Sequence, residues 1–159
     1  GYDGRPIVIL HVTDVAHQNG AAVVTRRRLE SIGFNVDDRT MDWSTNLTMR
    51  ARKEPPSEGG WNILHSWIDA VDAMNPVVNP HLSGEVYAGI PQIEKLVTDW
   101  VRATDQTGRK RLADEIQKVA LSEVTYVPWG EWFQPTAFRK NVRDVLKFDA
   151  PIFWNVKVA

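Results

Sequence analysis

The sequence predicts an α/β fold, with a mixed sheet flanked by helices. Residues 7–12 form a nearly continuous apolar run rich in β-branched side chains, which is typical of a strand covered on both faces. Residues 16–32 then show helical spacing, and Gly33 follows at the position where glycine commonly ends a helix. Residues 34–41 alternate in part and predict a second strand, so the chain opens with a βαβ unit. The side chains expected to face the core from the helix are Ala22, Thr25, Leu29 and Ile32.

The middle of the chain predicts a second helix, a loop and a third strand. Residues 43–53 suit a short helix with Ser44 as its cap. Residues 54–60 combine prolines and glycines and form the clearest loop. Residues 61–68 predict the third strand, and residues 69–89 predict a long irregular segment of the kind that often carries function.

Two helices and several short strands are expected in the remainder. Residues 90–103 have Pro91 in the first turn and apolar side chains along one stripe, and residues 105–124 continue the helical spacing. The short strands are rich in aromatic residues and are predicted at residues 126–129, 132–139 and 152–158.

Composition limits the classes of function. The chain has 159 residues, 43% of them hydrophobic and 25% charged, which suits one domain with a buried core. Its net charge of −1 provides no electrostatic footprint for nucleic acid. It contains no cysteine, so disulfides and thiolate chemistry are excluded. The chain opens without a methionine or a signal peptide, and we expect it to be a fragment of a longer protein.

Common catalytic and nucleotide-binding motifs are absent, and no cofactor is expected. None of the four histidines has a partner at the spacing of a helical metal site, so no metal site is expected. Asp14 and Asp42 follow the first two predicted strands, at the sheet edge where α/β proteins bind ligands. Two interpretations stay open: a metal or phosphoacceptor pair in a signalling or hydrolytic domain, or helix caps and turns.

Tryptophan is unusually frequent, with seven residues. Trp61 and Trp67 flank the third predicted strand and, being six residues apart, are expected on the same face. Tryptophan offers a large apolar surface and an N–H donor, which suits the wall of a cleft for peptides or sugars. Trp61, His65 and Trp67 are therefore candidate ligand contacts; for each of them, a place in the core or on the sheet face is the alternative.

Two acidic residues follow this strand. Asp72 lies in the segment that opens beyond it, where a carboxylate would pair with the ammonium group of a ligand. The alternative is an Asx-type turn ahead of Pro76. Asp69 lies three residues earlier, and either carboxylate is a candidate for the role.

Several stretches, taken in order, resemble the C-terminal lobe of the family 5 extracellular solute-binding proteins, the peptide, opine and nickel binders of ABC importers. The resemblance runs along essentially the whole chain and rests on the order and spacing of the stretches. They are residues 27–37 (ending IGFNVD), 41–43, 60–76, 93–96, 115–117 and 126–128.

The resemblance implies a lobe like those of type II periplasmic binding proteins, which close on their ligand by hinge motion. It implies that residues 1–125 form the C-terminal ligand-binding lobe. Residues 126–159 would then cross the hinge and return to an N-terminal lobe that is missing from this chain. In peptide-binding relatives, an aspartate after a tryptophan-rich strand holds the amino terminus of the peptide, and Asp72 occupies that place here.

The function implied is not enzymatic. The chain is expected to capture a peptide or another small solute for an ABC permease in the membrane, in the periplasm or at the cell surface. Sugar or opine binding is the alternative within the same transport class. A small signalling or hydrolytic domain that uses Asp14 and Asp42 is the alternative from another class.

Overall fold

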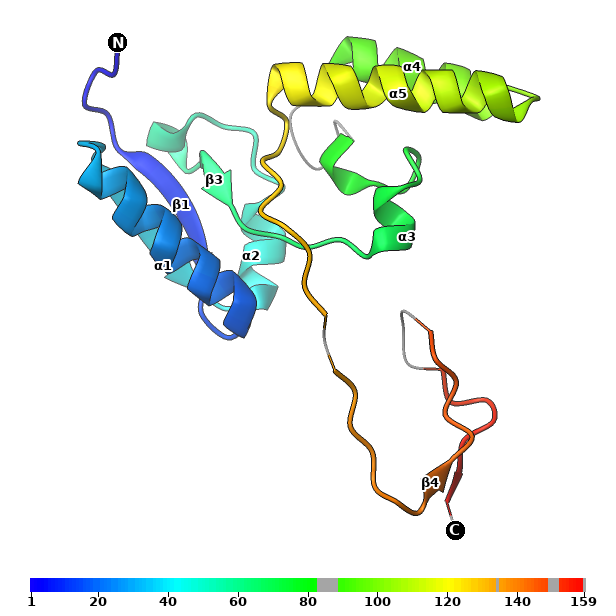
Figure 1. Ribbon diagram of the computed structural model, residues 1–159. Helices are drawn as coiled ribbons and strands as arrows, with labels where there is room; N and C mark the ends of the chain where they lie inside the picture. Colours follow the sequence, from blue (N-terminus) through cyan, green and yellow to red (C-terminus); the bar gives the residue numbers. More distant parts are fainter. Residues whose placement is uncertain (83–88, 134, 149–151, 159) are drawn as a thin grey trace. The chain divides into compact units, whose positions relative to one another are not determined.

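A computed structural model describes residues 1–82, 89–133, 135–148 and 152–158. The chain divides into two compact units, residues 1–126 and residues 127–159 (Figure 1). None of the described helices is long and apolar enough to cross a membrane.

A three-stranded parallel sheet forms the centre of the first unit. Its strands are β1 (Ile7–Val12), β2 (Val36–Met41) and β3 (Ile63–Leu64), in the order β2-β1-β3. Ile7 pairs with Val36, and Ile9 pairs with Ile63. The central strand β1 is buried on both faces, as its apolar run predicts. The α/β prediction is confirmed.

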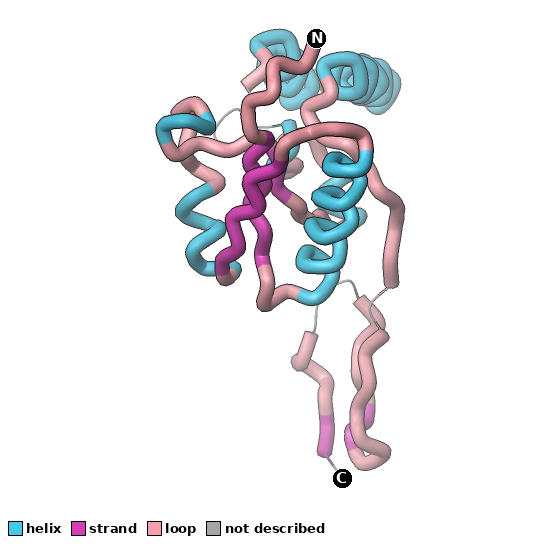
Figure 2. Tube along the Cα trace, turned by 90° about the vertical axis from the view of Figure 1, so that its left-hand side faces the viewer, coloured by secondary structure: helices cyan, strands magenta, loops and turns pink. Residues whose placement is uncertain are grey.

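Helices α1 (Ala16–Ser31) and α2 (Trp43–Met49) cover opposite faces of this sheet (Figures 1 and 2). Gly33 ends α1 as predicted: its φ of 92° is in the left-handed region, and its N–H donates to the Glu30 carbonyl. The Phe34 N–H donates to the Leu29 carbonyl, which completes a Schellman motif.

The predicted core-facing stripe of α1 is wrong in part. Ile32 is 56% exposed because it lies at the C-cap, beyond the last helical turn. The buried residues of the helix are Gln18 and Ala22, and only Ala22 was expected. Helix α2 is also shorter than predicted, since it ends at Met49 rather than near residue 53.

The third strand is much shorter than the predicted range of residues 61–68. Only Ile63 and Leu64 pair with β1. Before them, the Asn62 side-chain oxygen accepts from the Val8 N–H, and the Asn62 N–H donates to the Val8 carbonyl. Beyond Leu64 the chain leaves the ladder, so the following residues are placed by side-chain contacts rather than by strand pairing.

Residues 69–82 are largely irregular, as predicted, with two short helices. These are α3 (Ala70–Ala73) and the 3-10 turn η2 (Pro80–Leu82); another 3-10 turn, η1 (Pro56–Glu58), lies in the loop before β3. Part of the predicted loop, residues 83–88, lies outside the described residues.

Helices α4 (Pro91–Arg102) and α5 (Gln106–Glu123) form a helical hairpin (Figure 1). Pro91 lies in the first turn of α4, as predicted, and the Asp105 carboxylate caps α5 by accepting from the Gly108 N–H at 2.7 Å. The hairpin encloses an apolar core, whose buried members are Leu82, Ile93, Leu96, Leu112, Ile116 and Ala120.

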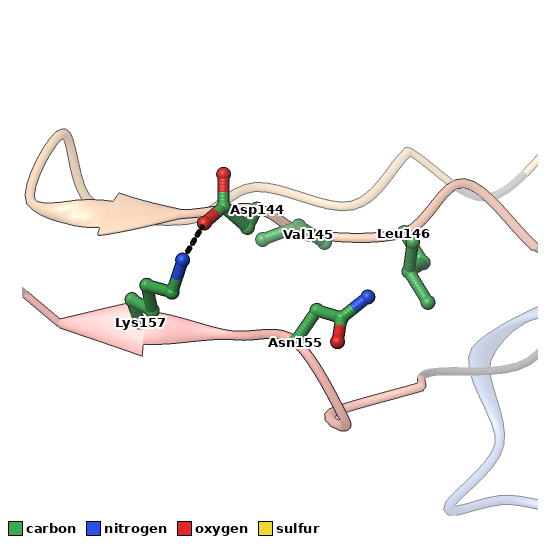
Figure 3. A pocket seen from close by; sticks show the side chains of 5 residues that line it. All are labelled: Asp144, Val145, Leu146, Asn155 and Lys157. Atoms are coloured by element: carbon green, nitrogen blue, oxygen red, sulfur yellow. Dashed lines mark ion pairs between the residues drawn. The ribbon is translucent and has the colours of Figure 1, made fainter.

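Among the described residues of the second unit there is one short antiparallel pair, β4 (Val142–Arg143) and β5 (Lys157–Val158). Figure 3 shows a hollow beside this pair, where Lys157 Nζ lies 2.8 Å from Asp144 Oδ2. The strands predicted at residues 126–129 and 132–139 are wrong, since the described residues of these segments contain no strand. Of the strand predicted at residues 152–158, only Lys157 and Val158 pair.

Candidate functional site

The carboxyl ends of the three parallel strands meet at one edge of the sheet. The Thr13 N–H donates to the Met41 carbonyl at 3.0 Å, so the chain segments that follow β1 and β2 start side by side. The segment after Leu64 starts at the same edge, because β3 is parallel to β1. Open α/β sheets bind ligands at this edge, and the side chains there form the candidate site.

Asp42 and Asp14 work as caps for helix α2. The Asp42 carboxylate accepts from the Thr45 N–H at 2.9 Å and from the Thr45 hydroxyl at 2.7 Å. The hydroxyl bond and the N–H bond hold the pKa of Asp42 below its usual value. Asp14 accepts from the Trp43 N–H at 2.9 Å. The capping interpretation is therefore confirmed, and the prediction that Ser44 caps this helix is wrong.

The two carboxylates are not part of a metal-binding group in the described part of the chain. No set of three or more histidine, cysteine, aspartate and glutamate side chains is gathered there in a way that could hold a metal ion. The oxygen atoms of Asp14 and Asp42 that face α2 accept backbone and hydroxyl hydrogens. This geometry favours a structural role for the pair.

Three aromatic rings gather at the sheet edge, and we call His17, Trp43 and Trp67 the edge cluster. The ring centroids of Trp43 and Trp67 are 5.2 Å apart, with the rings tilted by 34°. The His17 ring meets Trp67 nearly edge-on, with centroids 4.8 Å apart. Trp67 keeps 38% of its surface exposed, and His17 is exposed as well. The cluster thus offers an open aromatic surface to a ligand.

Sequence reasoning identified Trp67 but missed the other two rings. Trp43 follows β2 directly, and His17 lies in the first turn of α1, just after β1. Both residues follow a parallel strand in the sequence, and this position is the signal that could have identified them.

Trp61 and Trp67 contact different partners. Trp61 precedes β3 and its indole N–H donates to the Arg50 carbonyl at 3.3 Å, beyond the end of α2. Trp67 follows β3 and contacts Trp43 at the start of α2. The predicted common face required a continuous strand over residues 61–68, and the two-residue β3 does not provide one. The predicted strand length is wrong, and the shared face of the two tryptophans stays a prediction.

His65 lies against α1 rather than at the open edge. Its Nε2 atom is 2.8 Å from the Thr25 hydroxyl. Burial, and after it the charge of His11, lowers the pKa of His65. These contacts agree with a histidine on a covered sheet face, and its role as a ligand contact stays a prediction.

Asp69 and Asp72 are both exposed, close in sequence to Trp67. Asp69 stands at the N-cap position of α3, and Asp72 lies in its first turn. The Asx turn ahead of Pro76 is made by Asn75, whose side-chain oxygen accepts from the Val77 N–H at 3.0 Å. The turn interpretation of Asp72 is therefore wrong, and its carboxylate accepts no hydrogen bond from any described residue.

No known family model matches the chain. The whole chain is similar, with 31% identity over 165 residues, to a protein of Sinorhizobium fredii described as a probable peptide ABC transporter periplasmic-binding protein. The chain spans 31% of the length of that relative. This similarity supports a solute-binding protein family for the chain.

Proposed function

We propose that this chain is the C-terminal ligand-binding lobe of an extracytoplasmic solute-binding protein of family 5, which captures short peptides for an ABC permease. The observation that carries the proposal is the edge cluster, an exposed aromatic surface at the ligand-binding edge of a parallel sheet. The similarity over the whole chain to a probable peptide-binding transport protein supports the same role. The chain is thus proposed to be a transport component and not an enzyme.

The edge cluster suits an apolar or aromatic side chain of a peptide. The exposed part of Trp67 offers a flat apolar surface, and the Trp43 ring packs against Trp67 with the two centroids 5.2 Å apart. A ligand that covers such a surface removes apolar area from water, and this burial stabilises the complex by roughly 25 cal/mol per Å². Extended peptides are commonly bound through side-chain contacts of this kind together with main-chain hydrogen bonds.

A carboxylate beyond Trp67 would hold the peptide ammonium group. Asp69 and Asp72 are both exposed, so either can pair with a cation. An exposed ion pair of this kind contributes only about 0.2–1 kcal/mol, and removal from water makes it stronger. The proposed closure of the missing N-terminal lobe over the ligand would supply this burial.

The second unit is proposed to complete the missing lobe. Residues 127–159 expose large aromatic side chains, among them Phe133 at 91%, Phe153 at 75% and Trp154 at 88%. So much exposed aromatic surface is unusual for a segment that has no partner. We assign it to contacts with the N-terminal part of the longer protein, after the chain has crossed the hinge near residue 126. The protein would then lie in the periplasm or at the cell surface.

Sugar binding is the second candidate, and the exposed face of Trp67 is the observation that favours it. A flat indole face stacks on the ring of a sugar as readily as on an apolar side chain. Opines would engage the same surface and also the carboxylates. Both ligands keep the transport role and change only the class of solute.

Thermal-shift screening of the full-length protein tests the proposal. The panels are di- to hexapeptides, with sugars, opines and nickel for comparison. We expect peptides to raise the melting temperature, because a ligand that binds only the folded state stabilises it. Trp67→Ala should weaken peptide binding about tenfold, which corresponds to about 1.4 kcal/mol.

The control variants separate the site from general effects on stability. Trp61→Ala removes the same side chain from the other end of β3 and should leave the affinity unchanged. Asp72→Ala and Asp69→Ala decide which carboxylate holds the ammonium group, with the exposed Asp114→Ala on α5 as their control. If only sugars raise the melting temperature, the peptide assignment is overturned. If no panel raises the melting temperature, the transport role is overturned.

A further inference from the structure

A chain of polar side chains, buried at His11 and partly buried at its other members, ties α1 to the sheet. His11 on β1 is 5% exposed; its Nε2 atom lies 2.7 Å from Asn19 Oδ1 on α1, and its Nδ1 atom lies 2.8 Å from Asp38 Oδ1 on β2. Arg26, two turns after Asn19 on α1, donates from Nη1 to Asp38 Oδ2 at 2.8 Å. The helix is therefore attached to the two neighbouring strands at two points along its length. We call these four residues the buried network.

Two oxygen acceptors face the ring nitrogens of His11. The side-chain oxygen of Asn19 and the carboxylate of Asp38 can only accept, so both ring nitrogens must donate for both bonds to form. The fully bonded network therefore contains His11 as the imidazolium. The Asp38 carboxylate lies between this cation and Arg26.

A second histidine lies on the same face of the sheet. His65 on β3 is held by the Thr25 hydroxyl, and burial followed by the charge of His11 lowers its pKa. The face of the sheet under α1 thus carries His11, His65 and Asp38, with Arg26 reaching down from the helix.

The start of α1 has few other means of being held in place. No described side chain caps the helix at Val15, and its first turn contains no acidic residue. The buried side chains of α1 are Gln18 and Ala22, so little apolar surface is locked into the sheet. Hydrogen bonds are directional, and here they fix both the position of the helix along its axis and its rotation about that axis.

We propose that the buried network positions the first turns of α1, so that His17 stands against Trp67 in the edge cluster. Asn19, the end of the network, lies two residues after His17. His11, Asn19, Asp38 and Arg26 are then positioning residues for a ring that they do not touch. The importance of this placement for solute binding rests on the proposed function, whereas the placement itself does not.

Nuclear magnetic resonance of the full 159-residue chain tests the proposal without a ligand. The chain has four histidines, so each ring signal can be assigned with a single histidine-to-glutamine variant. At pH 5.5, we expect His11 to show two ring N–H protons that exchange slowly with water, because both are buried and bonded. We also expect a nuclear Overhauser effect between the His17 and Trp67 rings.

Substitutions of Asn19 and Asp38 then test whether the network is needed for the contact between the His17 and Trp67 rings. Asn19→Leu should abolish the ring-to-ring effect, and Asn19→Asp should keep it, because the aspartate retains an oxygen acceptor for His11. Asp38→Asn should also abolish it, whereas Asp37→Asn, the same change one residue earlier on β2, should keep it. If Asp38→Asn fails to fold, the Asn19 pair decides the question.

Two results would overturn the proposal. A folded Asn19→Leu variant with an unchanged ring-to-ring effect would show that the network does not position His17. A single protected ring proton on His11 at pH 5.5 would show that the imidazolium is not the bonded form. Loss of solute binding in the screen with both signals intact would instead refute the proposed function alone.

Discussion

Two helical interfaces of the first unit are built on opposite principles. Helices α4 and α5 meet through an apolar core in which Ile93 is 1% and Ile116 is 3% exposed. Helix α1 meets the sheet in part through polar side chains: His11 is only 5% exposed, and its ring lies within hydrogen-bond distance of Asn19 and Asp38. The same unit thus combines one interface stabilised by hydrophobic burial with another held by hydrogen bonds.

The difference separates stability from placement. Apolar contact is non-directional and tolerates small shifts, so the hairpin gains stability without strict registration of its helices. A buried hydrogen bond contributes only about 1 kcal/mol in net terms, yet it fails when its geometry is lost. The polar interface lies under the edge cluster, where exact side-chain placement matters, and the apolar hairpin carries none of the candidate ligand contacts.

The largest effect is expected in the apolar hairpin. Ile93→Ala should lower the free energy of unfolding by about 3 kcal/mol, because it leaves a cavity in a closely packed core. Leu121→Ala on α5 is the control, since Leu121 is 49% exposed and its loss should change stability by less than about 0.5 kcal/mol. Urea unfolding measures both, and equal losses would refute the packing of the hairpin described above.

The next effect is expected in the polar interface. Asp38→Asn should lower the free energy of unfolding by about 2 kcal/mol, because it leaves His11 and Arg26 without their shared carboxylate. The side chain of Asp38 is 12% exposed and that of Asp37 is 42% exposed. Asp37→Asn should therefore cost less than about 0.5 kcal/mol in the same urea experiment. A cost as small for Asp38→Asn would mean that the network adds nothing to stability.

A smaller effect of opposite sign is expected where the hairpin ends. Val124, at the C-cap of α5, has a φ of 53° and a ψ of 47°, a left-handed conformation that β-branched residues rarely adopt. Val124→Gly should raise the free energy of unfolding by about 1 kcal/mol, because glycine adopts this conformation without steric cost. Ser122→Gly, inside the same helix, should instead lower it by about 0.5–1 kcal/mol. Melting curves of the two variants should move in opposite directions.

The smallest expected effect is on the pH dependence of stability. The apolar hairpin region contributes His81 to it, and the polar interface under α1 contributes His65. Burial lowers the pKa of His81, whose ring centroid lies 5.4 Å from that of Tyr126, and burial and the charge of His11 lower the pKa of His65. The unfolded chain takes up these protons near pH 6.5, before the folded chain does, so the contribution of both groups to stability falls as the pH drops from about 7 to 5. His65→Gln and His81→Gln should each flatten this fall in comparison with the unchanged chain. A steeper fall in either variant would contradict the direction of the shift.

Local signals predicted the fold as far as local physics determines it. The apolar run of β1, the glycine after α1 and the proline at the start of α4 act over a few residues, and the structure confirms all three. Strand length depends on a partner elsewhere in the chain, and for this reason β3 and the terminal strands were predicted too long.

The candidate site was only partly within reach of the sequence. By itself the sequence determined the α/β class and the opening βαβ unit. It also pointed to Trp67 and the acidic residues that follow it as candidate ligand contacts. The tertiary structure alone decided that Trp67 meets His17 and Trp43, and that the Trp61 indole donates to the Arg50 carbonyl. It alone also revealed a polar face under α1, since His11, Asp38 and Asn19 belong to three different elements. The physical reason is that a sequence pattern reports which face of an element is apolar, whereas the partners of a side chain depend on how the elements are arranged in space.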